Sequence, residues 1–272
     1  MTPQSIRAIA DALLAAERDA SMLPPITAGH PDFDVNDAYA VLEQITQRRR
    51  AAGWEAVGRK IGFTNRTIWA RYGVDRPMWA PTWRQTMHHA TEGRAELAVA
   101  HFVQPRIEPE VVFGVAGPMP GVDDPDAILG AVAWVAAGFE IVQSHFPDWK
   151  FKVPDCTASF GLHGALVVGT PVPVTAANRS ALARVLATFE LTLRRNGAVV
   201  ERGVGANVLD SPALAMAYLV RVLASQPWAP PLAAGEIVTT GTVTDAWPVL
   251  PGDVFRSDYG ALGVPGLELT LV

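Results

Sequence analysis

Two glutamates separated by one residue, Glu108 and Glu110, are the side chains with the most evident chemistry in this sequence. Residues 106–113 have the pattern of a strand, in which alternate side chains share a face, so both carboxylates point the same way, with Cα atoms roughly 6–7 Å apart. Carboxylates aimed at one point repel unless a cation lies between them, and a hard divalent ion such as Mg²⁺ prefers such ligands. Pro109 has no N–H to donate, which predicts an edge strand or a bulge. A solvent-facing strand explains the same spacing, so the pair alone leaves both interpretations open.

A third carboxylate, Glu140, lies in the apolar segment 135–142. A carboxylate in a buried run needs a partner, because its desolvation is costly. It is either a core acid that is hydrogen-bonded to backbone or paired with an arginine, or the third ligand of the same metal.

Lys60 lies between two glycines in Gly58-Arg59-Lys60-Ile61-Gly62-Phe63. The glycines leave room for the close approach of a ligand or of another backbone. A lysine in a pocket near a metal can act as an acid or a base. A solvated strand lysine or a salt-bridge partner is the alternative.

Helical signals dominate the first part of the chain and strand signals the later part, which predicts an α+β fold. Caps, periodicity and turn residues define these segments. The predicted elements are a helix from Pro3 after a Thr2 cap, a helix over 34–52, a strand over 54–63, a short helix over 64–72, strands over 96–115, a helix over 125–133, a strand through Glu140, a hairpin at Asn196-Gly197, a helix from Ser211-Pro212 and strands over 236–272.

The composition excludes several functional classes. The chain of 272 residues has 22 Lys and Arg against 27 Asp and Glu, so its formal charge of −5 argues against nucleic acid as the main partner. The single cysteine, Cys156, excludes a disulfide framework and a Cys-based zinc site, which fits a reducing cytoplasm. We find no signal-peptide pattern and no apolar run of about 18–20 residues that would span a membrane, so we expect a cytoplasmic protein without a membrane partner.

An ordered set of segments along nearly the whole chain resembles the 2-keto-4-pentenoate hydratase family of the fumarylacetoacetate hydrolase superfamily. The segments are Gly58-Arg59-Lys60-Ile61-Gly62-Phe63-Thr64, Gly73-Val74-Asp75, Pro77-Met78-Trp79, Arg106-Ile107-Glu108-Pro109-Glu110, Phe139-Glu140-Ile141-Val142, Asp148-Trp149-Lys150, Gly205-Ala206-Asn207-Val208-Leu209 and Pro248-Val249-Leu250-Pro251-Gly252-Asp253. The resemblance implies a mixed β-roll or sandwich core with flanking helices and a helical N-terminal region. Residues 1–85 would form an N-terminal lobe that contributes to the active site, and residues 86–272 the catalytic core.

The resemblance also implies roles for individual residues. Glu108, Glu110 and Glu140 would bind Mg²⁺ or Mn²⁺, and Lys60 would be the active-site lysine. The candidate substrate-binding residues are Ser159, Leu162, His163 and Thr240.

The chain departs from the family pattern in the segment that follows the third carboxylate. Where many relatives read P-D-T-I-A-D-N-A-S-S, residues 154–163 have Ser159-Phe160 for the Asp-Asn pair and Leu162-His163 for the serine pair. If this segment lines the pocket, the distal end of the substrate meets a more apolar wall. His163 would either supply a polar contact or be a structural histidine.

The activity implied is a metal-dependent hydratase of aromatic catabolism, a homo-oligomer that acts on a small 2-oxo acid. The model reaction adds water to 2-hydroxypenta-2,4-dienoate and gives 4-hydroxy-2-oxopentanoate. Decarboxylation of 4-oxalocrotonate is the main alternative, and an added cation deep in the pocket would favour it, because that substrate has a second carboxylate. Hydrolysis of an acylpyruvate, with His89 and Glu92 as a water-activating pair, and a metal-bearing protein without catalysis are the remaining interpretations.

Overall fold

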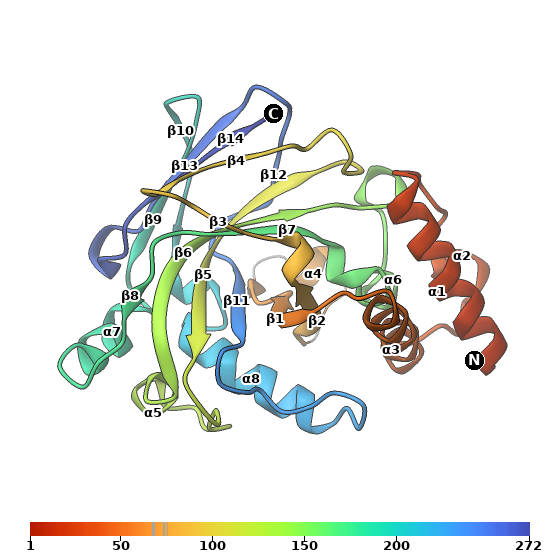
Figure 1. Ribbon diagram of the computed structural model, residues 1–272, viewed down its shortest axis with the longest axis horizontal. Helices are drawn as coiled ribbons and strands as arrows, with labels where there is room; N and C mark the ends of the chain where they lie inside the picture. Colours follow the sequence, from red (N-terminus) through yellow and green to blue (C-terminus); the bar gives the residue numbers. More distant parts are fainter. Residues whose placement is uncertain (67–68, 73, 75) are drawn as a thin grey trace.

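Two β-sheets packed against each other form the centre of the molecule, and helices cover their outer sides (Figure 1). The computed structural model describes residues 1–66, 69–72, 74 and 76–272. Gly73 and Asp75, which belong to one of the segments that resemble the family, lie outside the described residues. The mixed architecture confirms the expected α+β class.

The larger sheet has nine strands, and its main path runs β2-β1-β11-β5-β6-β7-β3, with β12 paired to β5 and β8 paired to β6. Its strands are β1 (Ala56–Gly62), β2 (Met78–Trp83), β3 (Met87–His89), β5 (Arg106–Val115), β6 (Val132–Val142), β7 (His163–Val168), β8 (Val172–Pro173), β11 (Ile237–Thr242) and β12 (Trp247–Pro248). The predicted N-terminal lobe therefore contributes β1 and β2 to the same sheet as the predicted catalytic core. The boundary at residue 85 stays a prediction.

The smaller sheet has five strands in the order β10-β9-β13-β14-β4. Its strands are β4 (Arg94–Leu97), β9 (Glu190–Arg195), β10 (Ala198–Val204), β13 (Val254–Asp258) and β14 (Leu267–Leu271). Phe255, Leu267 and Leu269 of this sheet are buried in one core with Phe113 and Phe139 of the larger sheet. Burial of these alternating apolar side chains holds the two sheets together.

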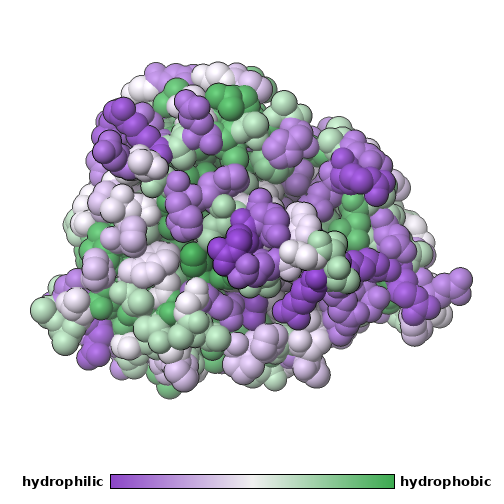
Figure 2. Space-filling view, in the orientation of Figure 1, coloured by the Kyte–Doolittle hydropathy of each residue, from purple (hydrophilic) through white to green (hydrophobic). Residues whose placement is uncertain are grey.

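The helices form two groups. The helices α1 (Pro3–Arg18), α2 (Ile26–Gly29), α3 (Val35–Ala51) and α6 (Val153–Ala158) lie at one end of the molecule, α5 (Pro125–Leu129) and α7 (Arg179–Val185) lie toward the other, and α8 (Pro212–Ala224) runs along the lower side between them (Figure 1). The remaining helix, α4, spans Trp69–Tyr72. No helix within the described parts of the chain is long and apolar enough to cross a membrane. Hydrophilic and hydrophobic side chains alternate over the face in Figure 2, and hydrophilic ones gather near α1 and α3.

Most predicted elements are confirmed, and the differences have local causes. Thr2 caps α1 through Ser5 N–H, and Asn196 and Gly197 both have the positive φ of a tight hairpin turn. The helix predicted over 64–72 is wrong at its start, because Asn65 pairs with Val208 in an isolated β-bridge. The helix predicted over 125–133 ends at Leu129, and β6 begins at Val132.

A buried histidine whose ring makes no hydrogen bond to the described residues lies where the N-terminal helices meet the core. His145 is 1% exposed, and neither ring nitrogen has a hydrogen-bond partner among the described residues. Its ring lies edge-on to Phe160, with 6.3 Å between centroids. Burial lowers the pKa of His145, and nearby Glu17 opposes this shift. The folded protein therefore holds a neutral imidazole here.

We expect His145→Phe to flatten the pH dependence of folding stability. The pKa of His145 is lower in the folded protein than in the unfolded chain, so the unfolded chain takes up the proton first as the pH falls. The stabilisation that neutral His145 contributes is therefore complete above about pH 6.5 and is lost as the pH falls toward the folded pKa. Between pH 7.5 and 5.5, wild type should lose about 1 kcal/mol more unfolding free energy than the variant. Urea unfolding of both proteins at pH 7.5 and 5.5 measures these free energies. Equal losses in wild type and variant would show that His145 does not contribute to the pH dependence of stability.

Candidate active site

Three carboxylates meet on neighbouring strands of the larger sheet. Glu108 of β5 lies directly opposite Glu140 of β6 in the strand register, and Glu110 lies two residues further along β5 on the same face. One carboxylate oxygen from each residue lies within 4.8 Å of the others. Glu110 and Glu140 are fully buried, while Glu108 is half-buried and lines a cavity. The structure thus brings together the three predicted metal ligands.

A bulge in β11 fixes the position of Glu110. The register between β11 and β5 shifts between Thr239 and Thr242, and Gly241 there has a φ of +99°. Gly241 N–H donates to Glu110 Oε2 at 2.6 Å, and the Thr239 hydroxyl donates to the same oxygen. A Cβ on Gly241 would lie 1.7 Å from Thr64 Oγ1, so only glycine fits.

The irregularity predicted from Pro109 belongs to the neighbouring strand. β5 is an interior strand of the sheet, so an edge position for Pro109 is wrong. Its carbonyl accepts a hydrogen bond from Val243 N–H at the end of the β11 bulge. The missing N–H of Pro109 therefore faces the place where the ladder of hydrogen bonds is already interrupted.

The electrostatics of the cluster are those of a site that needs a cation. Burial, reinforced by Glu140 and Glu108, raises the pKa of Glu110 well above its usual value. Burial also raises the pKa of Glu108 to about 7, although Lys60 opposes it. Burial acts the same way on Glu140, but Lys60 and His163 outweigh it and lower its pKa to about 2. Three carboxylates this close together, two of them fully buried, cannot all be charged without additional positive charge.

The donor set fits a hard divalent ion. Glu110 Oε1 is buried and has no hydrogen-bond partner among the described residues, so one oxygen of the cluster is free to coordinate. The ligand atoms are all carboxylate oxygens, which suits Mg²⁺, Mn²⁺ or Ca²⁺ better than a thiolate-seeking metal. These residues could hold such an ion while the cavity beside Glu108 admits a ligand.

Lys60 reaches the cluster from β1. Its Nζ lies 3.1 Å from Glu140 Oε2 and donates a hydrogen bond to Gly161 O at 3.0 Å. The side chain is 4% exposed, so a solvated lysine is wrong, and it lines the cavity with Glu108. Burial disfavours the ammonium form, but Glu140, Glu108 and Glu110 outweigh burial and raise the pKa of Lys60. Three strand spacings separate β1 from β6, so the sheet must curl for these side chains to meet.

His163 contacts the third carboxylate and not the cavity. Its Nδ1–H donates to Glu140 Oε1 at 2.7 Å, and its Nε2 lies 2.8 Å from Thr86 Oγ1. Thr86 Oγ1 lies 3.1 Å from Trp83 O as well, so the one hydroxyl proton of Thr86 is shared between these two contacts. Because both ring nitrogens are engaged, the ring holds Glu140 in a fixed orientation. The structure thus places His163 behind Glu140, and a direct contact of His163 with substrate stays a prediction.

The other predicted substrate residues have different fates. Leu162 lines the cavity, as expected. Ser159 is fully buried outside the described lining, and the Thr240 hydroxyl donates to Val111 O inside the sheet, so neither places its side chain in the cavity. Ser159 is followed by a left-handed turn, with positive φ at residues 160–162, in which Phe160 packs against Arg49 of the N-terminal helices.

We expect His163→Leu to weaken divalent-metal affinity by about 10- to 100-fold, because Glu140 loses the partner that orients it. His163→Asn retains a donor near the position of Nδ1 and should recover part of this loss. Calorimetric titration with Mn²⁺ measures both variants. Equal Mn²⁺ affinity in His163→Leu and wild type would show that the ring only fills space.

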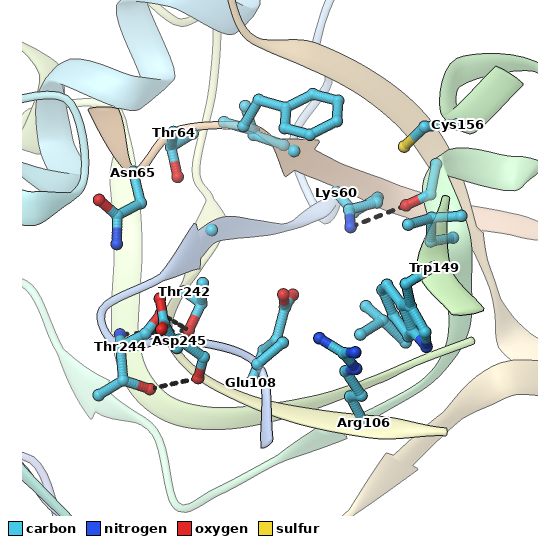
Figure 3. Close-up of a pocket in the computed structure, with 18 of the residues that line it drawn as sticks. Lys60, Thr64, Asn65, Arg106, Glu108, Trp149, Cys156, Thr242, Thr244 and Asp245 are labelled. Carbon is cyan, nitrogen blue, oxygen red and sulfur yellow. Dashed lines mark hydrogen bonds between the residues drawn. The ribbon is translucent and has the colours of Figure 1, made fainter. Parts of the chain in front are cut away.

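The cavity has a volume of about 120 Å³. An apolar cavity of about 150 Å³ holds benzene, so this space suits a ligand of a few carbon atoms. Figure 3 shows Glu108 near its centre, Lys60 above it, and Arg106 beside Trp149 on one side. Polar residues form the opposite wall: Thr64, Asn65, Thr242, Thr244 and Asp245.

Several lining residues were missed from the sequence. Arg106 lies two residues before Glu108 in the same strand, and the alternation that paired Glu108 with Glu110 would have placed it on their face. Trp149 belongs to a segment quoted only for its resemblance to the family. Nothing in the local sequence signals that Thr244 and Asp245 reach the same cavity.

Comparison with known proteins identifies the family. Residues 74–266 match the family model described as the C-terminal domain of fumarylacetoacetate hydrolase. The chain is 32% identical over 266 residues to a 2-keto-4-pentenoate hydratase of Paraburkholderia xenovorans strain LB400, covering 97% of this chain and 94% of that protein. It is 30% identical over 263 residues to a 4-oxalocrotonate decarboxylase of Pseudomonas sp. strain CF600, covering 96% of each.

A solved structure agrees with these sequence matches. The 4-oxalocrotonate decarboxylase of Pseudomonas putida G7, complexed with magnesium and adipate, has a TM-score of 0.89 and 25% identity, with coverage of 100% of this chain and 99% of that one. The chain therefore belongs to the fumarylacetoacetate hydrolase family, among relatives that include 2-keto-4-pentenoate hydratases and 4-oxalocrotonate decarboxylases.

Proposed function

We propose that this protein is a divalent-metal-dependent hydratase that adds water to a short unsaturated 2-oxo acid, with 2-hydroxypenta-2,4-dienoate as model substrate. The observation that carries the proposal is the meeting of three carboxylates within 4.8 Å, with Lys60 Nζ 3.1 Å from one of them. The relative of Paraburkholderia xenovorans named 2-keto-4-pentenoate hydratase supports this reaction class.

Glu108, Glu110 and Glu140 would hold the ion. A bound divalent ion supplies Lewis-acid stabilisation of the negative charge that develops on the 2-oxo oxygen of the substrate. His163 keeps Glu140 oriented, and the β11 bulge keeps Glu110 oriented. The solved relative that contains magnesium supports an ion of this kind.

Lys60 is the group that moves protons. Its Nζ delivers a proton to C5 of the dienol and recovers one from the enol hydroxyl, which gives 2-oxopent-3-enoate. Water then adds its oxygen to C4 while C3 gains a proton, and the product is 4-hydroxy-2-oxopentanoate. The hydrogen bond to Gly161 O and the contact with Glu140 fix Nζ for this role.

The walls of the cavity divide the remaining tasks. Leu162, Phe151 and Val142 provide an apolar surface for the hydrocarbon tail of the substrate. On the polar wall, Thr64 Oγ1 is buried without a hydrogen-bond partner among the described residues, so it is available to hold the attacking water.

Decarboxylation of 4-oxalocrotonate is the second candidate, because relatives with that name match nearly the whole chain. The hydrolase alternative finds no support in the site. His89 and Glu92 are both exposed, and neither lies among the described residues that line the cavity.

The test is to incubate the Mg²⁺-loaded protein with freshly made 2-hydroxypenta-2,4-dienoate and, separately, with 4-oxalocrotonate. We expect loss of the ultraviolet absorbance of the dienol, formation of 4-hydroxy-2-oxopentanoate, inhibition by a chelator and recovery with Mg²⁺ or Mn²⁺. Release of CO₂ from 4-oxalocrotonate without hydration of the dienol would identify a decarboxylase. No turnover of either compound would overturn both candidates.

A further inference from the structure

One positive charge in the cavity, that of Arg106, has no carboxylate within ion-pair distance in the described parts of the chain. Lys60 is engaged by Glu140, but Arg106 forms no ion pair within 4.0 Å among the described residues, although it lines the same cavity. Its guanidinium carbon lies 4.2 Å from the centroid of the Trp149 ring, so stacking holds it in place. Figure 3 shows its side chain directed into the space beside Glu108.

The strand places Arg106 beside the candidate metal ligands. Arg106, Glu108 and Glu110 alternate along β5 and share one face, so the Cα atoms of Arg106 and Glu108 are about 6.6 Å apart. A divalent ion held by Glu108, Glu110 and Glu140 would attract the 1-carboxylate of a 2-oxo acid. That attraction would bring the 1-carboxylate near Glu108 and within reach of the arginine.

The charges of the site leave room for one negative charge. The three carboxylates carry three negative charges, which the two positive charges of a divalent ion and the one of Lys60 would balance. The positive charge of the Arg106 guanidinium is then not balanced by any of these groups. The planar guanidinium can donate two parallel hydrogen bonds to the two oxygens of a carboxylate. Asp245 adds a fourth carboxylate on the opposite wall, but its side chain is exposed, so solvent screens its charge and it is left out of this balance.

We infer that Arg106 is a specificity-determining residue that binds the 1-carboxylate of the substrate, and that the pocket selects 2-oxo acids with an uncharged tail. This inference rests on the proposed function and deepens it. A second carboxylate on the tail would face Leu162, Phe151 and Val142, and apart from Lys60 and Arg106 the described lining offers no cation for it. Arg106 is thus the added cation that a dicarboxylate would need, but it lies at the head of the substrate.

The test measures binding of unreactive 2-oxo acids to the Mg²⁺-loaded protein by calorimetry, which does not depend on turnover. Wild type should bind 2-oxopentanoate at least 10-fold more tightly than 2-oxohexanedioate. Arg106→Gln should lower the affinity for 2-oxopentanoate by about 10- to 100-fold, as expected for loss of a charge-assisted contact with a carboxylate. The affinity for Mg²⁺ should stay unchanged or rise. Arg106→Lys should lose less affinity for 2-oxopentanoate, because lysine keeps the positive charge but cannot form the paired hydrogen bonds of a guanidinium.

Lys150→Gln is the matched control. Lys150 is adjacent to Trp149 in the chain, but its side chain is 80% exposed and paired with Asp148, so its removal should change 2-oxopentanoate affinity less than 2-fold. If Arg106→Gln lowers the affinity for 2-oxohexanedioate alone, the arginine binds the distal carboxylate and the inference is wrong. If neither acid is affected, or wild type binds neither, it is also wrong. Binding as predicted without hydration of the dienol would overturn the proposed function alone.

Discussion

Glu108→Gln is expected to weaken Mg²⁺ or Mn²⁺ binding by about 100-fold or more and to lower turnover by about 1,000-fold at a metal concentration that saturates wild type. Glu108 is the one of the three carboxylates that faces the cavity, and an amide removes its negative charge with little change in shape. Calorimetric titration with Mn²⁺ and initial rates with 2-hydroxypenta-2,4-dienoate measure the two effects.

The metal-free variant separates coordination from folding. Glu108 lies in a cluster with Glu140 and Glu110, so metal-free Glu108→Gln should unfold at the same or a higher urea concentration than metal-free wild type. Asp245→Asn is the matched control, because it removes a carboxylate from the same cavity outside the cluster, and its Mn²⁺ affinity should change less than 3-fold. Wild-type Mn²⁺ affinity in Glu108→Gln would contradict the ligand assignment.

Lys60→Ala is expected to bind metal at least as tightly as wild type and to lose about 100- to 10,000-fold in turnover, the range for loss of an acid–base group. Metal binding is retained because the substitution removes a positive charge that lies 3.1 Å from Glu140. Stopped-flow rates on the dienol and Mn²⁺ titration measure both quantities.

Added ethylamine should restore part of the Lys60→Ala rate in proportion to its concentration, because a small amine can occupy the vacated space and carry the proton. Lys60→Met fills that space and should show no rescue. A Lys60→Ala enzyme with the wild-type rate would remove Lys60 from the chemistry, and a slow enzyme that amines never restore would indicate a positioning role.

The local sequence was sufficient for features set by spacing along the chain. Alternation in a strand predicted that Glu108 and Glu110 share a face, and the turn residues Asn196-Gly197 predicted their hairpin. Glu140 was recognised as a buried acid that needs a partner, which the structure supplies in Lys60 and His163. These inferences depend on backbone geometry that neighbouring residues determine.

Features set by contacts between distant segments could not be predicted. The contact of Lys60 with Glu140 depends on the curl of a sheet whose strand order is not sequential. From the sequence, His163 was either a polar contact to substrate or a structural histidine, and the left-handed turn at 160–162 places Gly161 and Leu162, but not His163, among the described residues that line the cavity. Thr240 points to Val111 because the bulge in β11 reorients the strand after Thr239.

The most direct test of the central claim is a crystal structure of the Mn²⁺-soaked protein with anomalous data collected at the manganese edge. We expect one strong peak per chain, about 2.0–2.2 Å from an oxygen of each of Glu108, Glu110 and Glu140, with Lys60 lining the same cavity. A peak bound to other residues, or no peak at a Mn²⁺ concentration that supports turnover, would contradict that claim.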